Sequence, residues 1–374
     1  KSGKIRIYFM NKFLSKLKIN KPNNLFMRVS LKDHILFIKQ LATFVRAGVP
    51  LFSSLAMLKK NSKSRTMNKI MDQVVKDVEN GQYLATTLAK FKKFFGELTI
   101  SVIAVGEASG TLANNLDHLV LSLKKKQGLK RKVVGASVYP IFIIIATIAI
   151  TIMLTVFIFP KIIPVFQSIN YDLPWTTHFL IFLNNAIRNY WVFIVSGLVI
   201  VIVGIWLLLK VKKVHFWYDK ALLSVPLIGT IVRTYNAANV CRTLGLLLSS
   251  GTPVVRTFNI TSNTTGNILY KEELNKIADK ITKGEKISDQ LYSSPKLFPS
   301  IMAQMVSVGE STGKLSDTFL YLADIYEEEM DDITKNLSTT VEPMLLILMG
   351  ILVGFIAISI ITPIYGITQH LNPR

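Results

Sequence analysis

A short stretch near the C-terminus contains residue types that could bind a phosphate group. Residues 309–315 read GESTGKL, and in phosphate-binding loops such glycines let backbone N–H groups surround the anion. The spacing does not fit, because three residues separate the glycines instead of four, and Leu315 replaces the Ser or Thr that would bind Mg²⁺. We therefore interpret the stretch as a corner between two helices. Gly309 and Gly313 would allow a sharp bend or close helix contact, and Glu310 would form a cap or hydrogen bond.

Other residues with catalytic or metal-binding potential are dispersed. No histidine has metal-ligand spacing to another His, to the single cysteine, Cys241, or to a carboxylate. No Ser–His–Asp or Cys–His arrangement can be argued either. We expect the histidines to be solvated or at interfaces: His34, His118, His178, His215 and His370. The sequence predicts no catalytic residue, no metal and no cofactor, and so a protein that is not an enzyme.

The corner motif occurs twice. Residues 106–112 read GEASGTL and precede residues 309–315 by 203 positions. The same offset, without a gap, relates Gly48, Pro50, Gly106, Glu107, Gly110 and Pro140 to Gly251, Pro253, Gly309, Glu310, Gly313 and Pro343. This predicts an internal repeat of two copies, with a segment inserted between them. We expect these residues to form structural turns, contacts and breaks that both copies share.

Three apolar runs indicate a membrane protein. Half of the 374 residues (50%) are hydrophobic and the mean hydropathy is +0.39, although the chain has 44 Lys and Arg against 23 Asp and Glu. The runs 138–159, 191–209 and 344–362 contain no charged residue. At about 1.5 Å per residue they reach roughly 28 to 33 Å, which is the thickness of the hydrocarbon layer. We expect three transmembrane helices.

The basic residues predict how these helices are oriented. Residues 1–137 contain 26 Lys and Arg and residues 210–343 contain 15, whereas residues 160–190 contain two. The positive-inside rule therefore places the two large segments in the cytoplasm and residues 160–190 outside. The net charge of +21 is thus a topology signal. We expect no nucleic-acid partner, because the lysines are scattered and lack an interleaved aromatic platform.

The segments outside the membrane have the signals of helical bundles. Ser30 and Asp33 have capping-box spacing that should start the first helix, and Asn80-Gly81 marks a turn. We see no convincing strand alternation, so the predicted fold class is an all-α membrane protein with two tandem homologous bundles. The expected segments are a basic leader at 1–30, a first cytoplasmic domain at 31–137, a second at 210–343, an external loop at 160–190 and an external tail at 363–374.

The two copies differ in charge just before their spans. Lys124, Lys125 and Lys126 stand at the positions of Glu327, Glu328 and Glu329. Both runs could simply be solvated helix faces. An acidic run near anionic headgroups is unfavourable unless a cationic partner lies close, so we also consider that the two pre-span helices meet, within one chain or between protomers. Glu342, beside Pro343, could likewise be exposed or contact a partner helix.

The motifs also occur in an ordered set. In the first copy these are residues 39–42, 48–51, 106–112 and 136–140, and in the second they are residues 226–229, 242–244, 251–253, 309–315, 342–343 and 363–365. Over residues 31–371 this set resembles the type II secretion F proteins, the inner-membrane platform family of type II secretion and type IV pilus systems. The resemblance implies a non-enzymatic platform with two six-helix cytoplasmic domains and three spans in the bacterial inner membrane.

The resemblance further implies the partners and the role. The partners would be a cytoplasmic hexameric assembly ATPase, pilin or pseudopilin subunits, other inner-membrane assembly proteins, membrane lipids and further copies of the chain in a homo-oligomer. The role would be to couple the ATPase to insertion or extraction of pilin-like subunits. Two alternatives remain open at this point. One is a membrane permease subunit of an ATPase-driven transporter, and the other is a basic nucleic-acid-binding membrane protein suited to DNA uptake.

Overall fold

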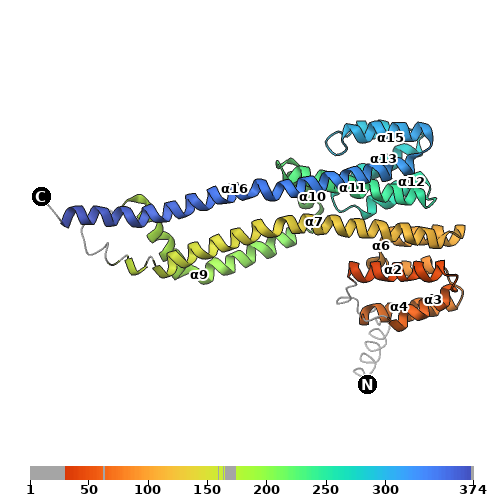
Figure 1. Ribbon diagram of the computed structural model, residues 1–374, viewed down its shortest axis with the longest axis horizontal. Coiled ribbons are helices and arrows are strands. Elements are labelled where there is room, and N and C mark those ends of the chain that lie inside the picture. The colour runs from red at the N-terminus through yellow and green to blue at the C-terminus, as the bar shows by residue number, and fades with distance from the viewer. Residues whose placement is uncertain (1–29, 62–63, 159, 163, 165–173, 372–374) are drawn as a thin grey trace, which may run out of the picture. The chain divides into compact units, whose positions relative to one another are not determined.

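The computed structural model describes residues 30–61, 64–158, 160–162, 164 and 174–371 (Figure 1). Within these ranges the regular elements are helices and no strand occurs, which confirms the predicted all-α fold class. The chain divides into two compact units, Lys1–Val120 and Leu121–Arg374. Apart from Ser30, the predicted basic leader lies outside the described residues.

The first unit is a set of helices separated by the predicted turn residues. They are α2 (Leu31–Arg46), α3 (Leu51–Asn61), α4 (Arg65–Glu79), α5 (Leu84–Ala89), α6 (Lys92–Ser109) and the first part of α7 (Leu112–Met153). Ser30 caps α2 as predicted, because its side chain accepts a hydrogen bond from the Asp33 N–H at 3.1 Å. Gly48, at φ 77°, lies between α2 and α3, and Pro50 directly precedes α3.

One histidine of this unit lies in the core. His34 is 5% exposed, its Nε2 is 3.2 Å from Thr99 Oγ1, and its ring meets the edge of Phe95 at 5.5 Å. Burial lowers the pKa of His34 to about 4. The prediction of a solvated or interfacial histidine is therefore wrong for His34. It shares the apolar face of α2 with Phe37, Ile38 and Leu41, which are also buried.

The second unit repeats this pattern and adds one helix before it. Its bundle contains α10 (Lys212–Ser224), α11 (Ile228–Ser249), α12 (Val254–Thr264), α13 (Ile268–Thr282), α14 (Ile287–Tyr292), α15 (Ser300–Thr312) and α16 (Leu315–Leu371). Helices α12, α13, α14 and α16 begin 203 residues after α3, α4, α5 and α7. The core is formed around Phe258, Tyr270, Phe298 and Phe319. The predicted repeat is therefore also a structural repeat.

In the part of the chain that the structure describes, three helices are long and apolar enough to cross a membrane. They are α7, which continues into the π-helical turn η2 (Leu154–Ile158), then α9 (Trp175–Leu208), and α16. Helix α16 runs without a break from the second bundle into its apolar part, and Pro343 lies inside it as Pro140 lies inside α7. A proline removes one backbone N–H and bends a helix without ending it when neighbouring helices support it.

Helix α9 begins within the segment that was expected to be an external loop. Its backbone leaves helical geometry at Tyr190, with φ −119° and ψ 16°, next to the predicted start of the span. The part before Tyr190 packs on α16, because Thr177 Oγ1 donates to the Ser359 carbonyl at 2.7 Å and the Trp175 ring lies 6.0 Å from Phe355. Hydropathy predicted only the second half of α9, because polar residues such as Arg188 interrupt the first half.

Candidate functional site

The predicted corner of the second copy is a helix end. Gly313 adopts a left-handed conformation, φ 72°, after α15, and the Lys314 N–H donates to the Gly309 carbonyl at 2.8 Å. The Glu310 carboxylate points away from solvent. It accepts the Ile287 N–H at 2.8 Å, the Ser288 N–H at 3.3 Å and the Ser288 hydroxyl at 2.9 Å. Glu310 thus caps the first turn of α14.

The first copy repeats this geometry residue for residue. Glu107 accepts the Leu84 N–H at 2.6 Å and the Ala85 N–H at 2.8 Å, which caps α5. Gly110 has the same φ of 72° as Gly313. Both carboxylates are therefore occupied by backbone donors, and neither corner leads from a strand into a helix as a phosphate loop does.

The remaining glycines and prolines that the two copies share determine how closely the helices pack and where they begin. A Cβ atom on Gly106 would lie 2.9 Å from the Leu112 Cα, and one on Gly309 would lie 2.9 Å from the Thr318 Cβ. The helices on either side of each corner therefore cross too closely for any side chain here. Gly251, at φ 86°, and Pro253 precede α12 in the same way as their counterparts precede α3.

A partly buried cluster of charges lies where α7, α11 and α16 meet in the second unit. Arg242 of α11 is 8% exposed and donates to Glu327 Oε1 from Nε at 2.9 Å and from Nη2 at 2.7 Å. Its Nη2 also donates to Asp324 Oδ1 at 2.5 Å. From α7, Lys125 Nζ lies 2.9 Å from Glu327 Oε2 and 3.3 Å from Asp324 Oδ1. We name Lys125, Arg242, Asp324 and Glu327 the charge cluster.

The contact between α7 and α16 continues toward the membrane. Lys132 of α7 forms an ion pair with Asp331 of α16. Between the two ion pairs, Leu129 is 3% exposed and belongs to the hydrophobic core of the second unit. A segment that belongs by sequence to the first copy is therefore part of the second compact unit.

The charges in the cluster stabilise one another's ionised forms. Hydrogen bonding to Glu327 raises the pKa of Lys125. Burial opposes ionisation of Arg242 and Asp324, but their hydrogen bonds to partners of opposite charge outweigh it. The pKa of Arg242 is therefore raised and that of Asp324 is lowered. The arrangement can hold α7, α11 and α16 in register.

The other predicted contact residues are not among the four that form this cluster. Lys124 and Glu328 are exposed, and they line one cavity with Lys125, Asp324 and Glu327. Lys126 lies beside a cavity that Asn236 and Asn239 also line, and burial lowers its pKa. Glu329 is exposed and accepts from Thr234 Oγ1 at 3.3 Å, whereas Glu342 is exposed on α16.

Sequence reasoning missed Arg242 and Asp324 as members of the cluster. The available signal was that Arg242 is one of only two charged residues in α11, the other being Arg233. A charge in the buried part of a helix is costly unless a group of opposite charge pairs with it. Among the described residues, no group of three or more His, Cys, Asp and Glu side chains could hold a metal ion.

Comparison with known proteins gives the family. Residues 37–160 and 240–363 each match the family described as type II secretion system (T2SS), protein F. The chain belongs to this family. The two matched segments stand in the same 203-residue register as the corners and helices, so the resemblance drawn from the motifs is confirmed.

The relatives span nearly the whole chain. The chain is 31% identical over 341 residues to the type IV pilus assembly protein PilC of Pseudomonas aeruginosa, which covers 90% of each protein. It is 31% identical to PilC of Thermus thermophilus over 91% of this chain and 84% of the relative. It is 28% identical to type II secretion system protein F of Xanthomonas campestris over 90% of this chain and 83% of the relative.

Proposed function

We propose that this chain is the inner-membrane platform protein of a type IV pilus, type II secretion or competence pseudopilus assembly machine. In this role it couples a cytoplasmic hexameric ATPase to the insertion or extraction of pilin-like subunits. It works as a homo-oligomer with other inner-membrane assembly proteins and with membrane lipids. The observation that carries the proposal is the double match to the protein F family on a chain with three apolar helices.

The proposed topology places residues 31–137 and 210–343 in the cytoplasm, with spans at 138–159, 191–209 and 344–362. The support is the Lys and Arg count of these segments. In this topology the third span returns the chain to the side reached by the first. Residues 160–190 and 363–374 then lie outside.

Cysteine labelling tests this topology in intact cells. Cys241 is buried, and burial raises the pKa of its thiol, so that the native residue gives little background. An impermeant maleimide should label Asn170→Cys and should not label Asn61→Cys until the cells are opened. Labelling of Asn61→Cys in intact cells would contradict the proposed topology.

The proposed role requires no catalysis by this chain. Both corners use their glutamates to cap helices, and Lys314, the residue that gave the second corner its phosphate-loop appearance, is exposed. We therefore expect purified protein neither to bind nor to hydrolyse ATP, and Lys314→Ala to leave assembly intact. Loss of nucleotide binding in Lys314→Ala would contradict the platform role.

Copurification from the native host tests the role itself. A tagged chain should retain an assembly ATPase and pilin-like subunits after detergent extraction, and deletion of its gene should abolish the surface filament or the secretion that depends on it. Retention of a transport ATPase with bound small substrate, together with normal filaments in the deletion strain, would instead indicate a permease subunit.

A further inference from the structure

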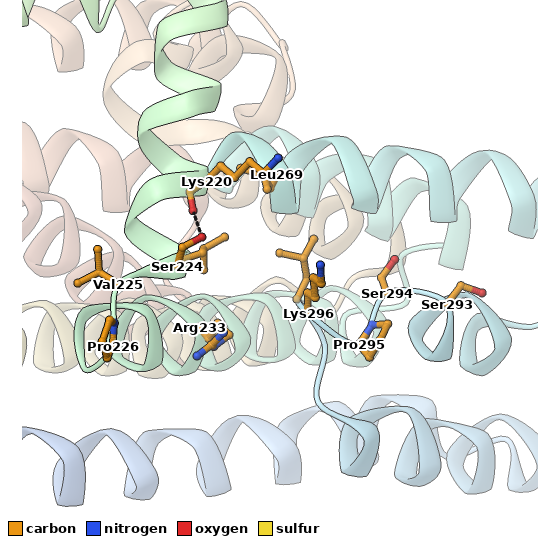
Figure 2. A pocket seen from close by; sticks show the side chains of 12 residues that line it. Lys220, Ser224, Val225, Pro226, Arg233, Leu269, Ser293, Ser294, Pro295 and Lys296 are labelled. Atoms are coloured by element: carbon orange, nitrogen blue, oxygen red, sulfur yellow. Dashed lines mark hydrogen bonds between the residues drawn. The ribbon is translucent and has the colours of Figure 1, made fainter.

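A cavity of about 800 Å³ lies in the second unit between α10, α11, α13 and the segment that joins α14 to α15 (Figure 2). Leucines line its apolar part: Leu223, Leu269 and Leu297. The charged residues that line it are Lys220, Arg233 and Lys296, and none of the lining residues carries a carboxylate. The cavity therefore combines an apolar wall with cations from three different elements.

These cations have no anionic partner within the described part of the chain. Arg233 is half-buried, and no ion pair joins it, Lys220 or Lys296 to a carboxylate. Lys220 instead lies over the ring of Trp217 at 5.3 Å. The neighbouring Glu273 is already engaged by other groups. Its carboxylate accepts from Ser294 Oγ at 2.6 Å and pairs with Lys276 at 3.1 Å. Three like charges around one apolar space favour a bound anion.

The first copy shows that the bundle does not need Arg233. The equivalent position there is Ser30, which caps α2. The same six-helix arrangement thus forms with a small neutral side chain at this site. A half-buried, unpaired guanidinium that the fold can do without is better explained by a ligand than by stability.

A strained turn borders the cavity. Leu227 has φ 65° and ψ −58°, and it is the one non-glycine residue with positive φ in the described part of the chain. The Ile228 N–H donates to the Pro226 carbonyl at 2.8 Å, which closes a γ-turn of the rare, strained kind. The Leu227 side chain is 55% exposed, so its burial does not offset the strain. Such strain tends to persist where the displayed side chains have a function.

The chemistry of the site favours a peptide over a nucleotide. None of the lining residues is aromatic, so the cavity offers no ring on which a base could stack. Val225 lines the cavity, and Leu227 and Ile228, which follow Pro226, also have exposed apolar side chains. An apolar edge beside unpaired cations fits a segment that carries both leucine-like and carboxylate side chains.

The level of Arg233 on α11 argues against a lipid headgroup as its partner. Thr234, next to Arg233, contacts Glu329 of α16 at 3.3 Å. The predicted span begins at Met344, which at 1.5 Å per residue lies roughly 22 Å farther along α16. The headgroup layer adds only about 5 to 8 Å beyond the hydrocarbon on each side. A headgroup would therefore end well short of Arg233.

We propose that this cavity, with the turn at residues 225–228, binds an acidic, leucine-containing peptide segment of a partner protein. The carboxylates of that segment bind Arg233, Lys220 and Lys296. Its apolar side chains pack against the leucines of the cavity and against Leu227.

A peptide-binding experiment on the full chain tests this proposal. The chain is reconstituted in nanodiscs of zwitterionic phosphatidylcholine, which expose both faces, so that the result does not depend on the proposed orientation or role. The probe is a fluorescein-labelled peptide, Glu-Asp-Leu-Leu-Asp-Glu, and fluorescence anisotropy gives its Kd. We expect saturable binding that falls with added salt, and no binding of the amide analogue Gln-Asn-Leu-Leu-Asn-Gln.

Matched variants locate the binding. Arg233→Glu should raise the Kd at least about tenfold, whereas Arg256→Glu, on the exposed surface of α12 and with the same change in net charge, should not change it. Arg233→Gln, which leaves no reversed charge in the fold, should weaken binding in the same direction. Leu227→Gly should relieve the strained turn and raise the thermal midpoint of the protein, yet weaken binding.

Three results would overturn the proposal. The first is no saturable binding by the unaltered chain, and the second is an equal loss in Arg233→Glu and Arg256→Glu. The third is displacement of the peptide when nanodiscs contain phosphatidylglycerol but not when the same lipid is added as separate vesicles. That third result would identify the occupant as a headgroup of the surrounding membrane.

Discussion

The two copies of the repeat have the same helix ends but different interiors. Glu107 and Glu310 each cap a short helix through two consecutive backbone N–H groups. In contrast, the first copy packs His34 against Phe95, whereas the second has Ala237 at the position of His34 and packs Tyr270 against the equivalent phenylalanine. The caps satisfy backbone groups whose positions the fold fixes, whereas a core tolerates any set of side chains that fills the same space.

The two copies also differ in the charges at equivalent helix positions. In the second copy Arg242 of α11 meets Glu327 of α16. In the first copy the same positions hold Lys39 and Lys124, two like charges that cannot pair. The second copy instead gains Lys125 from α7. The repeat thus provides a common frame, and the differences between the copies mark where the second one has acquired contacts of its own.

The largest effect should come from breaking the buried pair that only the second copy has. Arg242→Met removes the cation and leaves Glu327, which is 7% exposed, without its main partner. We expect the free energy of unfolding to fall by about 3 kcal/mol, because the remaining partner Lys125, whose side chain is 42% exposed, compensates the buried charge only in part. Thermal and denaturant unfolding of the full chain in detergent measure this loss.

The first copy supplies the matched control for this change. Lys39→Met, at the equivalent exposed position, should change the free energy of unfolding by no more than about 0.5 kcal/mol. Adding Glu327→Leu to Arg242→Met should recover most of the loss, since it removes a buried carboxylate that Lys125 alone compensates only in part. Equal effects of Arg242→Met and Lys39→Met would show that the cluster contributes nothing to stability.

Removal of the shared caps should affect both copies alike. Glu107→Ala and Glu310→Ala each leave two or more buried donors of a short helix without an acceptor. We expect a loss of about 2 kcal/mol in each unit, the magnitude of hydrogen bonds to a charged group. Hydrogen exchange should show the loss in α5 for the first variant and in α14 for the second. A loss confined to one copy would mean that the two corners are not equivalent.

Acid should destabilise the first copy through His34, which has no counterpart in the second. Its native pKa is lowered to about 4 from 6.5, so between these pH values the unfolded chain binds a proton that the native core does not. The contribution of neutral His34 to the free energy of unfolding is fully present above pH 6.5. It is lost as the pH falls toward 4, and about 2 kcal/mol is lost at pH 5.

Local hydrogen exchange in the full chain measures this pH effect. After correction for intrinsic rates, protection of α2 should fall from pH 8 to pH 5, and His34→Met should remove most of that fall. Helix α11, which has Ala237 at the equivalent position, should show no fall from this cause. A fall of α2 that persists in His34→Met would assign the acid sensitivity to other groups.

The fold was predictable from the sequence because its signals are local and repeated. Capping at Ser30, the turn glycines and the proline positions depend on backbone geometry, which the residue type alone indicates. The burial of His34 and the half of α9 before Tyr190 were not predictable in this way. Each depends on which face of a helix meets a neighbour, and that is decided by tertiary packing.

The candidate sites were likewise predictable from the sequence only in part. The opposite charges before the spans were visible, but which lysine reaches which carboxylate depends on helix rotation. Lys125 joins the charge cluster, whereas Lys124 is exposed and Lys126 turns to another cavity. The cavity at Arg233 had no sequence signal, because its lining comes from four separate elements that only the fold brings together.

The smallest effect on stability should come from exchanging a single ion pair between α7 and α16. Lys132 pairs with Asp331, and their side chains are 45% and 34% exposed. Exposed pairs contribute only about 0.2 to 1 kcal/mol, so Lys132→Asp should change the thermal midpoint little. We propose that such pairs fix the register of these two helices, and therefore expect Lys132→Asp to impair filament assembly or secretion at normal expression.

The reversed pair tests whether the contact or the charge itself matters. Combining Lys132→Asp with Asp331→Lys restores opposite charges across the same helices, and it should recover part of the assembly lost in each single variant. Lys130→Asp, which makes the same charge change at an exposed site on α7 outside this contact, should leave assembly near normal. If the double variant were no better than the worse single one, or if Lys130→Asp were equally harmful, the net charge of the pre-span segment would matter and the pairing would not.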